Sequence, residues 1–83
     1  MIEDPQAFVD AHCADYIARY GEEYRGAIVE AIYIASQLKT FNPVNFDFGK
    51  CIAAAVFSRM IVPRELWPSQ KIIRDAALGG RFR

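Results

Sequence analysis

Apolar residues recur three or four positions apart between Val9 and Leu38, and no other feature of the sequence constrains the fold as strongly. At about 100° per residue, this spacing places them along one broad stripe on the side of an α-helix. The stripe comprises Val9, Cys13, Tyr16, Tyr20, Tyr24, Ile28, Ala31, Ala35 and Leu38. No alternation of apolar and polar residues, the pattern of a half-buried strand, extends beyond the short stretch 45–48. The chain is therefore predicted to be all-α.

Gly21 interrupts this stripe, and it leaves two interpretations of the first half of the chain open. A glycine can end a helix as its C-terminal cap, which would give a hairpin of helices over 5–20 and 22–39. The phase of the stripe does not change at Gly21, however, so one long bent helix over 5–38 also fits. An internal glycine costs about 1 kcal/mol relative to alanine, which packing can offset. Such a long helix would predict an oligomer, because a small monomer cannot cover it.

Turn-forming residues delimit the next helix. Residues 40–45 include Pro43 and break the helical pattern, and Asn45 or Asp47 can cap a helix over about 48–61. This helix is apolar on every face. That is typical of a helix buried at the centre of a fold or shared with another subunit.

Two prolines divide the C-terminal part of the chain. Pro63 begins a short helix over 63–67, and Pro68 precedes a last helix over 69–78 that a pair of glycines ends. A chain of 83 residues has room for one domain, over 1–83. We therefore expect a small helical bundle of three to five helices.

Composition excludes several classes of protein. The chain has ten acidic and ten basic residues and is 53% apolar and 13% aromatic, so it is neither a disordered tail nor a polybasic arm. Cys13 and Cys51 lie in apolar helical patterns, which favours buried reduced thiols over a disulfide. Two cysteines and the single His12 cannot form a structural zinc site. No motif for a cofactor is present, so we expect neither a metal nor a cofactor.

The sequence does not predict insertion into a membrane or export. The most apolar stretch, 51–62, is shorter than the roughly twenty residues that a membrane-spanning helix needs. The acidic segment 1–5 lacks the basic and apolar regions of a signal peptide. We therefore expect a soluble, cytoplasmic protein without membrane contacts.

The sequence contains no assembled catalytic group. Asp10, His12 and Asp15 are the one cluster that resembles acid–base equipment, but no nucleophile accompanies them. His12 lies off the centre of the apolar stripe, which favours a surface histidine. We expect no catalytic residues and no enzyme activity.

Tyrosines form the first candidate binding surface. Tyr16, Tyr20 and Tyr24 are spaced four residues apart, so they share one helix face. Each hydroxyl needs a hydrogen-bond partner or water, which makes such a row unusual in a core. Core packing, a protein interface, and stacking of a nucleotide-like small ligand are all consistent with it. The aromatic residues considered for partner binding are Tyr16, Tyr20, Tyr24, Tyr33 and Trp67.

Charge is divided along the chain although the total is zero. Residues 1–30 contain seven acidic residues and two arginines, a net charge of −5, and residues 31–83 therefore carry +5. The two halves can neutralise one another within the fold, pair between subunits, or steer an external partner. The acidic residues considered for partner binding are Asp10, Asp15, Glu22, Glu23 and Glu30.

A degenerate helix-turn-helix over 52–77 is an alternative use of the basic half. The helix that begins near Ser69 exposes polar residues at its start, as a recognition helix does. Two prolines and a tryptophan stand where such motifs usually have a short glycine-containing turn. The residues that would contact nucleic acid are Lys50, Arg59, Arg64, Ser69, Gln70, Lys71 and Arg74.

The favoured function is a small non-catalytic protein-binding module that forms a homodimer and binds a further, unidentified protein. The chain has no assembled site but has surplus apolar and aromatic surface for its length. In size and composition it resembles phage- and plasmid-encoded inhibitors of host machinery, such as anti-CRISPR and other anti-defence proteins. The alternatives are the DNA-binding regulator and an oligomer that sequesters a nucleotide-like ligand through its tyrosines. Nucleic acid is thus a possible partner but not the favoured one.

Overall fold

All regular structure in the described part of the chain is helical. The computed structural model describes the backbone of residues 2–39 and 41–79, and the side chains of these residues as far as Arg74. Within these ranges no strand occurs, which confirms the predicted all-α class. The elements are α1 (Pro5–His12), α2 (Ala14–Tyr20), the 3₁₀ helix η1 (Glu22–Tyr24), α3 (Arg25–Ala35), α4 (Phe48–Phe57), the 3₁₀ helix η2 (Arg64–Leu66) and α5 (Gln70–Gly79).

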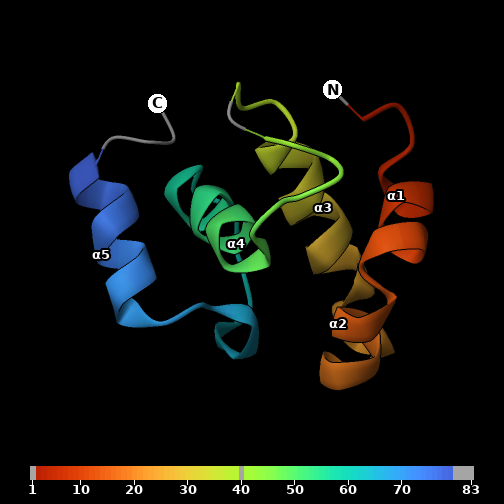
Figure 1. Ribbon diagram of the computed structural model, residues 1–83. Coiled ribbons are helices and arrows are strands. Elements are labelled where there is room, and N and C mark those ends of the chain that lie inside the picture. Colours follow the sequence, from red (N-terminus) through yellow and green to blue (C-terminus); the bar gives the residue numbers. More distant parts are fainter. Residues whose placement is uncertain (1, 40, 80–83) are drawn as a thin grey trace.

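Gly21 turns the chain back on itself, so the first half is a helical hairpin. Its φ of 116° and ψ of 154° form a backbone conformation that is nearly restricted to glycine. After this residue, α3 runs back and packs against α1 (Figure 1). The hairpin interpretation is therefore correct, and the single bent helix over 5–38 is wrong.

The predicted helix over 5–20 is interrupted at Cys13. Asp4 caps its first part, α1, because the carboxylate accepts a hydrogen bond of 3.1 Å from the Ala7 amide. Cys13 has φ −121° and ψ 16°, which ends α1 and begins α2. The interruption leaves Val9, Cys13 and Ile17 all buried in the core. After this break, which no glycine or proline marks, Ile17 enters the core, whereas Tyr16 and Tyr20 of the apolar stripe are half-buried.

The third helix is shorter than predicted at both ends. The predicted helix over 22–39 consists in the structure of the 3₁₀ turn η1 followed by the α-helix α3, which ends at Ala35. Beyond Ala35 the backbone hydrogen bonds join residues three positions apart, as in a turn: the Gln37 amide donates to the Ile34 carbonyl over 3.2 Å. The buried Ser36 hydroxyl donates to the Tyr33 carbonyl over 2.7 Å.

Helix α4 also ends earlier than the predicted range 48–61, at Phe57. Arg59 has a φ of 65°, in the left-handed region. The amides of Arg59 and Met60 donate to the carbonyls of Val56 and Ala55 over 3.0 and 3.1 Å. This pattern is a Schellman motif, in which a left-handed residue usually supplied by glycine stops the helix.

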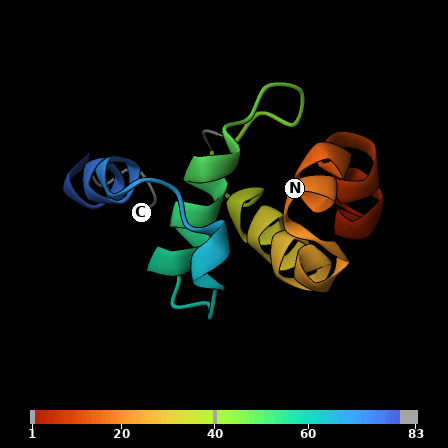
Figure 2. The ribbon, with the colours of Figure 1, turned by 90° about the horizontal axis from the view of Figure 1, so that it is seen from below.

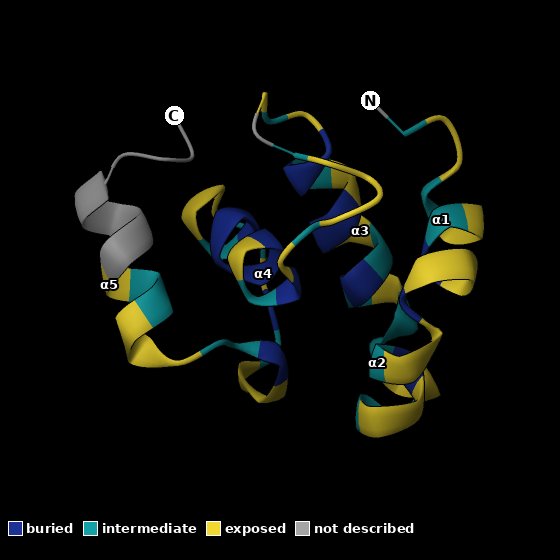
Figure 3. Cartoon of the chain, in the orientation of Figure 1, coloured by how far each residue is buried: buried dark blue, intermediate teal, exposed yellow. Residues whose placement is uncertain are grey.

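Helix α4 lies at the centre of the molecule. It packs against α3 on one side and α5 on the other (Figures 1 and 2). Residues 51–55 are all buried, which confirms the prediction of a central buried helix. Figure 3 shows buried residues on the facing sides of α3 and α4, with exposed residues on the outer surfaces of α1 and α2.

The two cysteines are free thiols within this core, as predicted. Burial raises the pKa of Cys13 to about 11 and, with a contribution from Cys13 itself, that of Cys51 to about 12. Ile28, Ile32, Ile52 and Leu66 are the largest buried side chains of this core, with exposed fractions of 2% or less. Among the helices described, none has the length and apolar character that crossing a membrane requires.

Candidate functional site: an aromatic pocket at the start of helix α4

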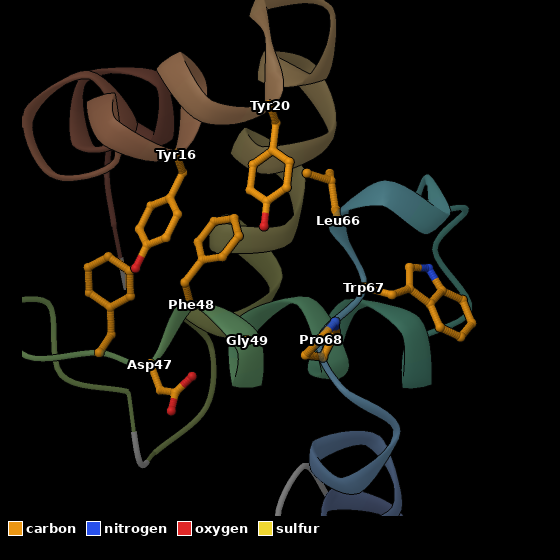
Figure 4. A pocket seen from close by; sticks show the side chains of 9 residues that line it. Tyr16, Tyr20, Asp47, Phe48, Gly49, Leu66, Trp67 and Pro68 are labelled. Carbon is orange, nitrogen blue, oxygen red and sulfur yellow. The ribbon is translucent and has the colours of Figure 1, made fainter.

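A pocket of about 420 Å³ lies where three separate parts of the chain meet. Helix α2 forms one wall, the residues that begin α4 form the floor, and the connection from η2 to α5 forms the other wall (Figure 4). The lining residues are Tyr16, Tyr20, Phe46, Asp47, Phe48, Gly49, Leu66, Trp67 and Pro68. Three of the aromatic residues that the sequence proposed for partner binding, Tyr16, Tyr20 and Trp67, thus lie together.

Stacking on Phe48 fixes the two tyrosines. The rings of Tyr16 and Phe48 are parallel within 8° and their centroids are 3.9 Å apart. Tyr20, one turn further along α2, lies 6.4 Å from the same ring at 17°. Phe48 is buried, whereas both tyrosines are half-buried. The pocket therefore has a packed aromatic wall that is formed before any ligand binds.

The opposite wall is held by the 3₁₀ helix η2. Leu66 is 2% exposed and anchors this turn in the core. The Trp67 indole N–H donates to the Val62 carbonyl over 2.9 Å, and the Arg64 guanidinium lies 4.5 Å from the centre of the indole. Figure 4 shows the indole turned away from the tyrosine rings, so Trp67 closes the edge of the pocket rather than its centre.

Asp47 supplies the one charged side chain of the lining. Its Oδ1 caps α4 by accepting a hydrogen bond of 3.1 Å from the Lys50 amide. The residue is exposed, and among the described residues its carboxylate makes no ion pair. Figure 4 shows this carboxylate pointing away from the rings of Tyr16 and Tyr20, toward the start of α4.

The remaining predicted aromatic residues lie outside this pocket. Tyr24 is half-buried in η1, where desolvation, followed by the carboxylates of Glu65 and Glu23, raises the pKa of its hydroxyl. Tyr33 is on α3 and is 39% exposed. The tyrosine row therefore divides, and only its first two members form the pocket.

The predicted acidic surface is partly neutralised within the hairpin. The Arg25 guanidinium binds Glu22 over 2.7 Å and also contacts Asp10, which joins α3 to α1. The hydrogen bond from Arg25 lowers the pKa of Glu22, and the two carboxylates raise that of Arg25. These three side chains also line a second pocket, which Ala14, Ile17, Ala18 and Gly21 complete. The other predicted acidic residues, Asp15, Glu23 and Glu30, are exposed.

The predicted nucleic-acid residues are exposed but do not form a helix-turn-helix. Residues 58–69 connect α4 to α5 and include η2, whereas such motifs use a turn of about three or four residues. Ser69 directly precedes α5, and its hydroxyl accepts a hydrogen bond of 3.4 Å from the Ile72 amide. The part of the motif beyond Arg74 lies outside the described side chains. The exposed residues of this set are Lys50, Arg59, Arg64, Ser69, Gln70, Lys71 and Arg74.

The structure brings no metal-binding group together in the part of the chain that it describes. His12 is exposed, and its ring lies 4.5 Å from that of Phe8.

Sequence reasoning missed six pocket residues as members of a site: Phe46, Asp47, Phe48, Gly49, Leu66 and Pro68. Asp47 was recognised as a helix cap and Phe48 as a helix residue. The contact of Phe48 with α2 is non-local and leaves no trace in the spacing of residues. Comparison with the models of protein families, with curated proteins and with solved structures finds no match to this chain.

Proposed function

We propose that the protein is a small, non-catalytic protein-binding module whose aromatic pocket receives a side chain of its partner. The observation that carries this proposal is the wall formed by Tyr16 and Tyr20 on the buried ring of Phe48. Tyrosine is enriched in binding hot spots because it combines a large apolar ring with a hydroxyl that tolerates water.

Preorganisation supports the same proposal. The ring of Phe48 holds Tyr16 at 3.9 Å, so binding need not immobilise this side chain again. A volume of about 420 Å³ lies in the usual range for ligand pockets and suits one or two side chains. Helices α2 and α4 and the turn η2 all contribute to the pocket, so the core itself sets its shape.

The same proposal extends to the protein's setting. We infer that the protein works in the cytoplasm, forms a homodimer and binds another protein as an inhibitor, of which anti-CRISPR and other anti-defence proteins are examples. The exposed apolar residues Val44, Phe57 and Ile61 lie outside the pocket and supply surface for association between subunits. Sedimentation equilibrium at micromolar concentration tests this part, and a monomer there would contradict it.

Affinity capture with paired variants tests the pocket. Tagged wild-type protein and the Tyr20→Leu variant would be compared in lysate, with folding checked by circular dichroism. The control is Tyr33→Leu, the same change at a 39% exposed tyrosine of α3 that lies outside the pocket lining. The proposal expects a stoichiometric partner that Tyr20→Leu loses and Tyr33→Leu retains. Retention of the partner by both variants would contradict a role for the pocket.

Two further assays separate the alternatives. A DNA-binding regulator should shift duplex DNA at about 50 mM salt and lose affinity steeply as the salt rises. A protein that sequesters nucleotides should gain thermal stability in a nucleotide screen. We expect neither effect, and either one would favour the corresponding alternative.

A further inference from the structure

The two groups of charge in this chain lie on opposite sides of the central helix α4. Figures 1 and 2 show α1 and α2 on one side of α4 and α5 on the other. Helix α5 exposes Lys71 and Arg74, and we call this surface the basic end; the range 58–83 has a net charge of +4. The range 5–35, which contains α1 to α3, has a net charge of −3. Its exposed acidic residues, which we call the acidic end, are Asp10, Asp15, Glu22, Glu23 and Glu30.

The two ends do not neutralise each other within one molecule. Among the described residues, the ion pairs join Arg25 to Asp10 and to Glu22, so both stay on the acidic side. Helix α5 packs against α4, and α3 separates α4 from α1. Because packed helices lie about 8–10 Å apart, α5 and α1 are separated by more than twice the screening length, which is about 10 Å at 0.1 M ionic strength. The charge of each end is therefore free to act on another molecule.

A second copy of the chain supplies both charges in matching amounts. Residues 1–30 carry −5 and residues 31–83 carry +5, whereas a partner of one sign would cover only one of the two ends. In a dimer with two-fold symmetry, the acidic end of each copy meets the basic end of the other, so both pairs of ends form at once. A single head-to-tail contact instead leaves one end of each sign open, and association continues into chains. Charge complementarity therefore favours the closed, antiparallel dimer.

We propose that two copies of the chain associate side by side and antiparallel, with the acidic end of each against α5 of the other. This inference rests on the proposed function, because it names the contact of the homodimer proposed there. Charge pairs across an interface fix the orientation of the subunits more than they add affinity. The competing arrangements are open chains and a dimer held only by the exposed apolar residues Val44, Phe57 and Ile61.

Charge reversal at each end tests this arrangement by sedimentation equilibrium. The acid-reversed variant is Glu23→Lys with Glu30→Lys, and the base-reversed variant is Lys71→Glu with Arg74→Glu. These four side chains are exposed, make no ion pair with the described residues and lie outside the aromatic pocket. In a homodimer of either variant, like charges face one another at both contacts. Each variant alone, with folding checked by circular dichroism, should therefore self-associate on the order of tenfold more weakly than the wild type.

An equimolar mixture of the two variants restores attraction at both contacts, because the new lysines of one face the new glutamates of the other. Native mass spectrometry, with one variant labelled with ¹⁵N, should show the heterodimer in excess over both homodimers. The matched control is Lys39→Glu with Lys50→Glu, which changes the net charge by the same amount as the base-reversed variant. These two exposed lysines lie after α3 and within α4, between the two ends. We expect the control to self-associate nearly as well as the wild type.

The wild type gives an independent measurement, since its dimer should weaken between about 50 and 500 mM salt as the charges are screened. A dimer that is indifferent to salt overturns the charge pairing, and so does a reversed variant that self-associates as well as the wild type.

The other results separate the two proposals. A mixture without heterodimer, or a control as weak as the base-reversed variant, also overturns the pairing of the ends, and open chains overturn the antiparallel arrangement. A wild-type dimer found together with any failed charge test still supports the proposed homodimer, held by its apolar residues. A wild-type monomer at both salt concentrations refutes the homodimer and this inference together. Capture with Tyr20→Leu decides the role of the pocket separately.

Discussion

Replacement of Gly21 by alanine tests the hairpin on which the whole arrangement depends. Gly21 has φ 116° and ψ 154°, where a side chain costs about 1–3 kcal/mol in backbone strain. An added Cβ would also lie 2.6 Å from Glu23 Oε1, but this atom ends a flexible side chain and can move away. Alanine also stabilises the protein by about 0.4–1 kcal/mol, because it reduces the conformational entropy of the unfolded chain. The net expectation is a loss of about 1–2 kcal/mol in the free energy of unfolding.

The sign of this change separates the two interpretations that the sequence allows. In a continuous helix over 5–38, Gly21→Ala would stabilise the protein by about 1 kcal/mol, because alanine is the better helix former. In the hairpin the same substitution destabilises it. For a domain of this size, each kcal/mol corresponds to about 4–8 °C in the melting temperature. Urea unfolding followed by far-ultraviolet circular dichroism resolves such a difference.

Gly26 provides the matched control. It lies at the start of α3, where an added Cβ would meet no atom within 4 Å. Gly26→Ala should therefore raise the free energy of unfolding by about 0.5–1 kcal/mol. If Gly21→Ala is as stable as the wild type or more stable, the positive φ at Gly21 and the hairpin argument are both refuted.

Three further predictions concern the core and the helix ends. Arg59→Gly should stabilise the protein by about 0.5–1 kcal/mol in urea unfolding, because glycine adopts the left-handed conformation of this cap without strain; a loss of stability would count against it. Cys13 and Cys51, with pKa values raised to about 11 and 12, should resist iodoacetamide at pH 8 until urea unfolds the chain. Fast alkylation of the native protein would show that the thiols are accessible. Arg25→Gln should reduce the loss of stability in acid. In the wild type, the hydrogen bond from Arg25 lowers the pKa of Glu22 below its ordinary value of 4.5. The stability that this shift contributes is present above pH 4.5 and is lost as the pH falls through the folded-state pKa. Identical acid denaturation curves for variant and wild type would contradict this.

Local signals predicted helices where the residues themselves specify them. The acids Asp4 and Asp47 cap α1 and α4 as their side chains suggest, and the apolar faces of α3 and α4 are buried. The predicted helix bounds are wrong where a helix ends without the glycine or proline that usually marks such an end. Arg59 ends α4 in a conformation that glycine normally supplies, and Cys13 breaks the first helix without glycine or proline. Cys13 is fully buried, so packing in the core fixes that break, whereas the exposed Arg59 is held by backbone hydrogen bonds at the end of α4. A pattern of spacings records neither cause.

The pocket was predictable only in part for the same reason. Tyr16 and Tyr20 share a helix face, so their proximity follows from their spacing. Their contact with Phe48 joins residues far apart in the chain, and it depends on how the hairpin docks on α4. No periodicity encodes that docking. Asp47 is a further example, because its role as a cap conceals its position in the pocket.

The division of charge along the chain bears on how the protein meets a partner. Residues 1–30 carry −5 and residues 31–83 carry +5, yet both ion pairs among the described residues join Arg25 to acids of its own half. Within the described part of the chain, the two halves therefore do not neutralise one another through salt bridges. Of the three uses considered for this asymmetry, pairing between subunits and docking of a charged partner are the two that need unpaired charges at the surface. Both make association weaken as salt rises, because exposed charges are screened over about 10 Å at 0.1 M ionic strength.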